Sequence, residues 1–457
     1  MLALRTKATF SPRCGRTFRR RTVTCCWTKM HSLESWLVPI QFDKPEPGDG
    51  ARRGPRRLWT VPLAPRVPSS GFEGLALLEE LQGEVAGILF ACFRDGLLWA
   101  ATDPAARREL FGPRSREISR ITEPSLSSAV EVFGKLVTGG VGGSELTRAC
   151  ADVAAWASTE GYPVTEYLFT VLAAYASPTD PYAAFAAGRA ARRYRRIEDA
   201  RTWFKRTIAL ARRADDEAAS ASAFLGWGIL EERLGNREKA AAKFVKAWRA
   251  AKRGGLPELA GATRHNMIAL ALGERDFAAG NGHIVAAYKL YGRRNPQLYR
   301  LANDAAGFWS AFGYFSLSLP LFEAALPHVV RADERMAILA NISRAAAGLG
   351  DRERYLEAWD QALELERAAG EALPEIYMEL ARGAHALGYH VRANDLATKA
   401  RVTAESRRSE NTIREAQSLL DDVAGRVSPD PPRIGDPPLE RFAVRFSQRL
   451  RELGESA

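Results

Sequence analysis

The chain has 457 residues, of which 46% are hydrophobic and 26% charged, values that are ordinary for a soluble globular protein. No run of about 18 apolar residues occurs, so the sequence predicts no membrane-spanning helix. The formal net charge is +11, but residues 1–29 carry eight Lys or Arg and no acid, which leaves +3 for all other residues. That small remainder argues against a general affinity of the folded part for nucleic acid.

The basic segment 1–29 admits three interpretations. It is rich in Arg and Thr without acids, as transit peptides are; it could be a basic arm for nucleic acid or an anionic surface; or translation begins at Met30. It has no apolar stretch of about 7–15 residues, which argues against a secretory signal. Residues 43–57 are rich in Pro, Gly and charge, so residues 1–57 together are predicted to be a disordered tail and linker.

Residues 58–143 are predicted to form a mostly helical N-terminal module. The Asp95-Gly96 pair lies between two apolar runs and could mark a hairpin. Helices are favoured instead, because the apolar residues keep helical spacing, as at Leu89, Phe93 and Leu97.

Two short helices and a helical hairpin follow. The short helices are predicted at 104–111 and 125–137, and the hairpin occupies 144–177 with its turn at Gly161. The hairpin has the outline of a helix-turn-helix, but its second helix offers no Lys or Arg for phosphate contacts. It is therefore predicted to be a degenerate repeat that caps the first end of a solenoid.

Residues 178–427 repeat a helical pair every 37 to 40 residues. Five units share a small residue in the first helix, namely Gly188, Gly228, Ala306, Ser343 and Ala381. Twelve residues later lie Ala200, Ala240, Ser318, Tyr355 and Ala393. Sixteen residues later lie Phe204, Phe244, Phe322, Trp359 and Ala397. A third unit, at about 257–294, cannot be aligned because Gly280-Asn281-Gly282 interrupts it. A period of this length predicts stacked helical hairpins.

This pattern resembles the tetratricopeptide repeat, which places a small residue in its first helix and a small residue, an aromatic ring and an alanine in its second. The unit that matches best contains Phe224, Trp227, Gly228, Ala240, Phe244 and Ala247. Units longer than about 34 residues resemble those of bacterial signalling and regulatory members. The resemblance implies an all-α, right-handed superhelical solenoid of five to seven helical pairs.

Residues 428–457 are predicted to be a Pro-rich linker and a terminal helix. The helix places five apolar residues on one face, namely Leu439, Phe442, Phe446, Leu450 and Leu453. This amphipathic face could dock back on the solenoid, pair with a second copy to form a homo-oligomer, or bind a partner. Docking in cis is the favoured interpretation.

The residues that usually carry chemistry are not arranged for it. Gly139–Gly143 lacks the Gly-Lys-Ser/Thr of a phosphate loop, and the six histidines have no metal-ligand spacing. Cys92 and Cys150 are expected to be buried free thiols, as in a cytoplasmic protein. The acids Glu231 and Glu232 are interpreted as a solvated helix face. The sequence therefore predicts no enzyme, no cofactor and no metal site.

The resemblance also implies where a partner would bind. In the family, residues around the small position of the first helix line a concave groove. Mapped onto this chain, those positions are Arg189, Arg192, Leu225, Ile229, Arg300, Asn303, Arg344, Arg382 and His385. Five of them are arginines, whose planar guanidinium grips carboxylates with two hydrogen bonds. An acidic peptide is the partner that such a groove would select.

The predicted function is a non-catalytic scaffold or regulator that holds a peptide or helix in the concave groove. The alternative is a transcriptional regulator in which the repeats sense a signal and the N-terminal module contacts DNA or the transcription machinery. No basic recognition helix supports the alternative, so binding of nucleic acid is not expected, and neither is association with a membrane.

Overall fold

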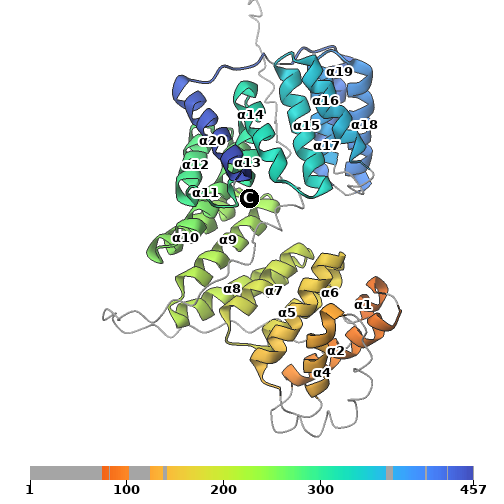
Figure 1. Ribbon diagram of the computed structural model, residues 1–457, viewed down its shortest axis with the longest axis vertical. Coiled ribbons are helices and arrows are strands. Elements are labelled where there is room, and N and C mark those ends of the chain that lie inside the picture. The colour runs from red at the N-terminus through yellow and green to blue at the C-terminus, as the bar shows by residue number, and fades with distance from the viewer. Residues whose placement is uncertain are drawn as a thin grey trace, which may run out of the picture.

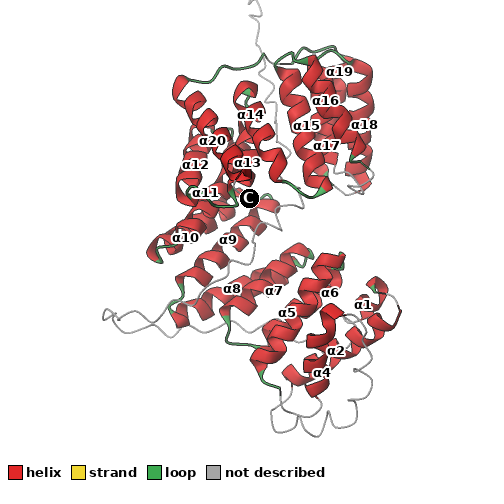
Figure 2. Ribbon diagram, viewed as in Figure 1, coloured by secondary structure: helices red, strands yellow, loops and turns green. Residues whose placement is uncertain are grey.

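The computed structural model describes residues 75–81, 83–101, 124–136, 141–366, 374–406, 409–429 and 431–455. All regular elements within these ranges are helices (Figures 1 and 2), as the sequence predicts. No helix among them is long and apolar enough to cross a membrane. The predictions for the tail and linker 1–57 and for the short helix 104–111 fall outside the described residues.

The described part of the N-terminal module packs on the first helical hairpin in one apolar core. Its buried residues include Phe93, Phe133 and Phe169, whose rings pack edge to face or tilted. Asp95 and Gly96 lie inside a helix, which confirms the helical prediction over the hairpin. The elements are α1 (Leu75–Glu80), α2 (Gly83–Ala101), the 3-10 turn η5 (Pro124–Leu126), α4 (Ser127–Leu136), α5 (Gly143–Glu160) and α6 (Pro163–Ala176).

The hairpin α5–α6 begins a solenoid of stacked helical pairs (Figure 1). Left-handed glycines end the first helices where the sequence predicts turns, with φ of +77° at Gly235 and +78° at Gly350. The pairs that follow are α7 (Pro181–Arg193) with α8 (Ile197–Ala214), α9 (Glu217–Arg233) with α10 (Arg237–Arg253), α11 (Pro257–Glu274) with α12 (Phe277–Tyr291), α13 (Leu298–Ala311) with α14 (Phe315–Ala325), α15 (Ala332–Gly348) with α16 (Arg352–Glu364), and α17 (Pro374–Ala386) with α18 (His390–Ser406). The single helix α19 (Glu410–Ala424) ends the stack.

Aromatic rings of the second helices fill the space that the small residues leave open. A Cβ added to Gly228 would lie 2.4 Å from the ring of Phe244, so the ring lies directly over the glycine. The ring of Phe204 lies in the same way against Gly188 and also against Gly226 of the next pair. The ring of Phe244 therefore occupies the space opposite Gly228.

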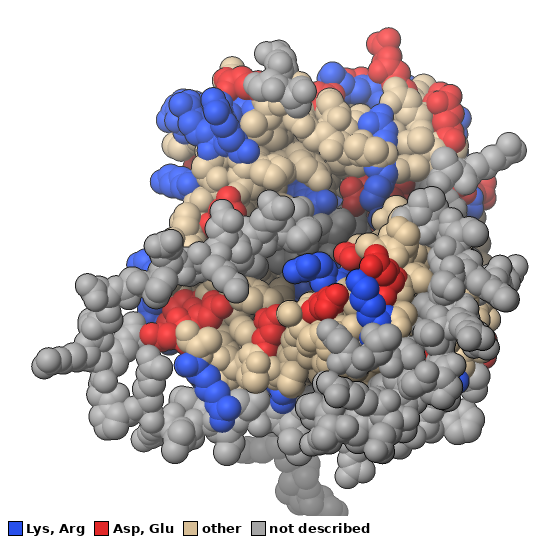
Figure 3. Space-filling view, turned by 60° about the horizontal axis from the view of Figure 1, so that its bottom comes forward, with Lys and Arg blue, Asp and Glu red and all other residues tan. Residues whose placement is uncertain are grey.

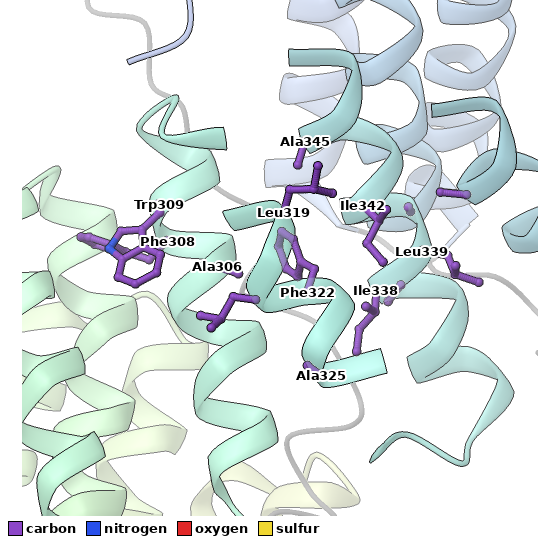
Figure 4. Packing of buried hydrophobic residues seen from close by; sticks show 14 of the residues in the cluster. Ala306, Phe308, Trp309, Leu319, Phe322, Ala325, Ile338, Leu339, Ile342 and Ala345 are labelled. Atoms are coloured by element: carbon purple, nitrogen blue, oxygen red, sulfur yellow. The ribbon is translucent and has the colours of Figure 1, made fainter. Parts of the chain in front are cut away.

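The same ring position joins consecutive pairs further along the chain. Figure 4 shows the ring of Phe322 on α14 between Ala306 on α13 and the isoleucines Ile338 and Ile342 on α15. All four are buried in one continuous hydrophobic core. The ring at this position thus lies between consecutive pairs at both Phe204 and Phe322.

The structure also aligns the third unit. The residues spaced at 12, 16 and 19 from Ile268 are Gly280, Ile284 and Ala287, and all except the glycine belong to the buried core. The usual order of sizes is therefore changed, with a large residue in the first helix and glycine at the start of the second. Gly280 admits the ring of Phe308, which lies 2.1 Å from where a Cβ would be.

The last helix, α20 (Pro437–Glu455), docks in cis on α12, α13 and α14 (Figure 1). Phe442 and Phe446 pack against Tyr288, and Phe442 also meets Trp309. At its end, the ring of His328 bonds with the carbonyl of Leu450 over 2.9 Å. The helix thus braces the junction between the third and fourth pairs, and its apolar face is occupied within the same chain.

Candidate binding surface

The nine residues predicted to line the groove all lie on first helices of their pairs. Arg189 and Arg192 are on α7, Leu225 and Ile229 on α9, Arg300 and Asn303 on α13, Arg344 on α15, and Arg382 and His385 on α17. Five of the nine are buried, namely Arg192, Leu225, Ile229, Asn303 and His385. A partner could reach these five only at their edges, so part of the predicted set belongs to the packing between helices.

Arg344 and Arg382 are held by carboxylates of neighbouring first helices. Arg344 donates to Glu379 over 2.5 Å, joining α15 to α17. Arg382 donates to Glu379 over 2.6 Å and to Glu415 over 2.8 Å, joining α17 to α19. The side chains are only 6–16% exposed. Because their charges are matched inside the protein, these two arginines connect repeats and present little positive field to a partner.

Arg300 belongs to the same series one repeat earlier. Burial raises the pKa of Glu334 on α15, and the positive charges of Arg300 on α13 and of Arg331 oppose that rise. The three Arg-to-Glu separations are 34, 35 and 33 residues. This recurring interval is present in the sequence and could have identified the glutamates that lie near these arginines. The prediction of a groove for an acidic peptide did not include these glutamates.

Glu231 also corrects a prediction. It is 3% exposed and accepts hydrogen bonds from Arg201, Trp227 and Asn236, at 2.9, 2.9 and 2.8 Å for the shortest of each. Three side chains from α8, α9 and the following turn thus meet at this carboxylate, so Glu231 does not belong to a solvated helix face. Its neighbour Glu232 is partly buried, and burial raises its pKa to about 7.

A second polar cluster joins the third and fourth pairs. The ring of His265 on α11 bonds through Nε2 with Asp304 on α13 over 2.6 Å and through Nδ1 with the Tyr291 hydroxyl over 3.2 Å. All three side chains are buried. Burial raises the pKa of Asp304, and the contact with His265 opposes the rise. The cluster thus links α11, α12 and α13 through buried hydrogen bonds.

The residues that follow the small position of each first helix form a regular series, which we call the inner positions. Two residues of this series were absent from the prediction. One residue after the small position, the series reads Arg189, Ile229, Ala269, Gly307, Arg344 and Arg382. Ala269 and Gly307 are partly exposed. They were missed because the third unit could not be aligned and because small residues carry no chemical signal. Their size leaves room on the inner side at the middle of the solenoid.

The charges around a hollow in the surface are mixed. Figure 3 shows a hollow at the centre of the view with both basic and acidic side chains along its border. The surface offers many hydrogen-bonding groups but no strong field of one sign.

No group of side chains suited to a metal ion occurs among the described residues. Both cysteines that the structure describes are buried, and burial raises the pKa of the Cys92 thiol to about 12. A thiol in such surroundings is a poor nucleophile.

No family model and no curated protein matches the sequence. Solved structures similar in fold include BtubC (BKLC) from P. vanneervenii, at 14% identity over 49% of this chain and 91% of that one, with a TM-score of 0.38. Another is a Signal Transduction ATPase with Numerous Domains (STAND) protein with a tetratricopeptide repeat sensor from Pyrococcus horikoshii, at 12% identity with a TM-score of 0.47. The match covers 84% of this chain and 61% of that protein's length.

Proposed function

We propose that the chain is a non-catalytic scaffold or regulator that binds a peptide or a helix of another protein along the first helices of its repeats. The observation that carries the proposal is the series of inner positions, which recurs every 37 to 40 residues on successive first helices. Stacked repeats of this kind create an extended surface in which many shallow contacts add together.

The ion pairs between first helices support a fixed surface. Arg344, Glu379 and Arg382 connect α15, α17 and α19, and Arg192 donates from α7 to the carbonyl of Gly226 on α9 over 3.3 Å. A surface held in advance loses less conformational entropy when a partner binds. In this proposal the arginines hold the binding surface in shape, and the partner is recognised by shape and hydrogen bonding more than by net charge.

The proposal is tested by obstructing the inner side without removing any internal contact. Ala269→Trp adds a large ring at a partly exposed inner position where alanine makes no polar contact. Val402→Trp is the control, because Val402 is 55% exposed on the second helix α18. Each full-length chain is used as bait for affinity capture from its native host, followed by mass spectrometry.

We expect proteins captured by the wild type to fall at least tenfold with Ala269→Trp and to persist with Val402→Trp. Circular dichroism should show the same helicity for all three chains. Equal capture by Ala269→Trp and the wild type would contradict binding along the inner side.

A further inference from the structure

Unmatched positive charge lies at a different place from the inner arginines. Lys205 on α8 and Lys243 and Lys246 on α10 surround two aromatic rings of α9, and we call these three residues the lysine cluster. The Lys243 ammonium lies 3.3 Å from the centroid of the Trp227 ring, and that of Lys205 lies 5.8 Å from the same centroid. The Lys246 ammonium lies 5.8 Å from the Phe224 ring.

Among the described residues, no carboxylate forms an ion pair with the lysine cluster. No Asp or Glu oxygen of these residues lies within 4.0 Å of any of the three ammonium groups. The charge of Glu231 acts on Lys243, but its carboxylate is already bonded to Arg201. This contrasts with Arg344 and Arg382, whose charges are matched by Glu379 and Glu415.

The three ammonium groups also repel one another. The pKa of Lys243 is lowered by burial first and then by the charges of Lys246 and Lys205. Lys205 and Lys246 are exposed, so a ligand from solution can reach them. A ligand that brings negative charge relieves this repulsion and also gains charge-assisted hydrogen bonds.

We infer that the lysine cluster is a docking site for an acidic peptide segment, with carboxylates contacting the ammonium groups and an apolar side chain lying beside the partly exposed Trp227 ring. The inference rests on the proposed binding function and adds to it a second contact surface and a chemical class of partner. Charge complementarity is the argument for this occupant, since three lysines lie beside aromatic rings here and no carboxylate among the described residues forms an ion pair with them.

A peptide fits the cluster better than a nucleic acid does. Strong binding to a nucleic acid usually needs about 6–10 phosphate contacts, whereas the cluster provides three ammonium groups. Exposed acids also lie near the starts of the same two helices, Glu198 on α8 and Glu238 on α10. A phosphate backbone that continued along these helices would meet negative charge, while a short acidic segment would not.

The test uses the full-length chain and a fluorescein-labelled 12-residue peptide of repeated Asp-Glu-Leu. Affinity is measured by fluorescence anisotropy at low and physiological salt. The variant is Lys205→Gln with Lys243→Gln and Lys246→Gln. The matched control removes three exposed positive charges elsewhere, by Lys289→Gln, Arg441→Gln and Arg445→Gln. Protection of the cluster lysines from acetylation by the bound peptide, read by mass spectrometry, locates the site.

We expect the cluster variant to bind the peptide at least tenfold more weakly and the control variant to stay within twofold of the wild type. Lys205, Lys243 and Lys246 should be protected from acetylation. Equal binding by the cluster variant, no binding by the wild type, or tighter binding of a 12-nucleotide single strand that depends on the same lysines would each overturn the inference.

The outcome is separable from that of the proposed function. If the peptide fails to bind while Ala269→Trp still blocks capture of native proteins, the lysine cluster is not a docking site and the inner-side proposal stands. If the peptide binds at the cluster while Ala269→Trp changes nothing, the inner-side proposal fails instead.

Discussion

Single glycines set how closely the helices of this solenoid approach one another. Gly280 and Gly282 lie two residues apart on α12, yet their surroundings differ completely. A Cβ at Gly280 would lie 2.1 Å from the fully buried ring of Phe308, whereas a Cβ at Gly282 would have no atom within 4 Å. The same residue type is thus required at one position and merely tolerated at the other.

This contrast gives a prediction at the residue scale. Gly280→Ala should destabilise the chain by about 1–3 kcal/mol, because the added methyl group overpacks the core against Phe308. Gly282→Ala should stabilise it by up to about 1 kcal/mol, because alanine is the better helix former. Urea unfolding followed by circular dichroism measures both, and equal effects of the two substitutions would contradict the packing described for Gly280.

The sequence could not assign these roles. It marked Gly280-Asn281-Gly282 as an interruption, because two glycines in a predicted helix carry no sign of what lies opposite them. Only the position of Phe308, a residue of the next pair, distinguishes one from the other. Likewise Glu231 and Glu232 are adjacent acids that the sequence grouped together, whereas Arg201, Trp227 and Asn236 converge on Glu231 alone.

At the scale of elements, the arginines of the first helices are better described as links between repeats than as ligands. Arg382 is 16% exposed and bonded to Glu379 and Glu415, which are themselves 6% and 11% exposed. Reversing Arg344 and Arg382 to glutamate would therefore place like charges together and unsettle the fold. Such a variant cannot separate partner binding from folding.

A neutral substitution tests the linking role. Arg382→Met should cost about 3 kcal/mol, because it leaves two largely buried carboxylates without this partner. Arg401→Met should cost less than about 1 kcal/mol, since Arg401 and Glu405 form an exposed pair. The readout is urea unfolding, and similar costs for the two variants would refute the assignment of Arg382 as a structural link.

The terminal helix gives a second prediction at this scale. Phe446 is fully buried against Tyr288, whereas Val444 on the same helix is 56% exposed. Phe446→Ala should cost about 3–5 kcal/mol, and Val444→Ala should change stability by no more than about 0.5 kcal/mol. Limited proteolysis should cut the Phe446→Ala chain before α20; resistance equal to that of the wild type would show that α20 does not brace the stack.

Much of the element order could be predicted from the sequence, because the small and aromatic positions recur at a regular interval. The spacing of the apolar residues also predicted the apolar face of α20. It did not predict which helices this face contacts. The contacts of Phe442 and Phe446 with Tyr288 and Trp309 join residues more than 130 positions apart, and no local pattern encodes such a distance. A homo-oligomer formed through α20 stays a prediction. In the structure, the apolar face of α20 already contacts α12, α13 and α14 of the same chain.

At the scale of the whole molecule, the chain is a helical-repeat solenoid with a cluster of three lysines between α8 and α10. The sequence indicated binding as the mode of action, since stacked repeats form extended surfaces. It could not show that Arg344 and Arg382 are matched by Glu379 and Glu415, because that pairing depends on the twist that brings residues 35 and 33 positions apart into contact.

Site-specific photocrosslinking tests the proposed inner-side binding most directly. The photoreactive amino acid benzoylphenylalanine replaces Ala269 on the inner side of α11 in one chain and Val402 on the exposed side of α18 in another, and each chain is irradiated in extract of the native host. Crosslinks to the same protein from position 269, with none from position 402, are the predicted result. Crosslinks from position 402 alone, or from neither position while the wild type still captures its partner, would contradict binding along the inner side of the solenoid.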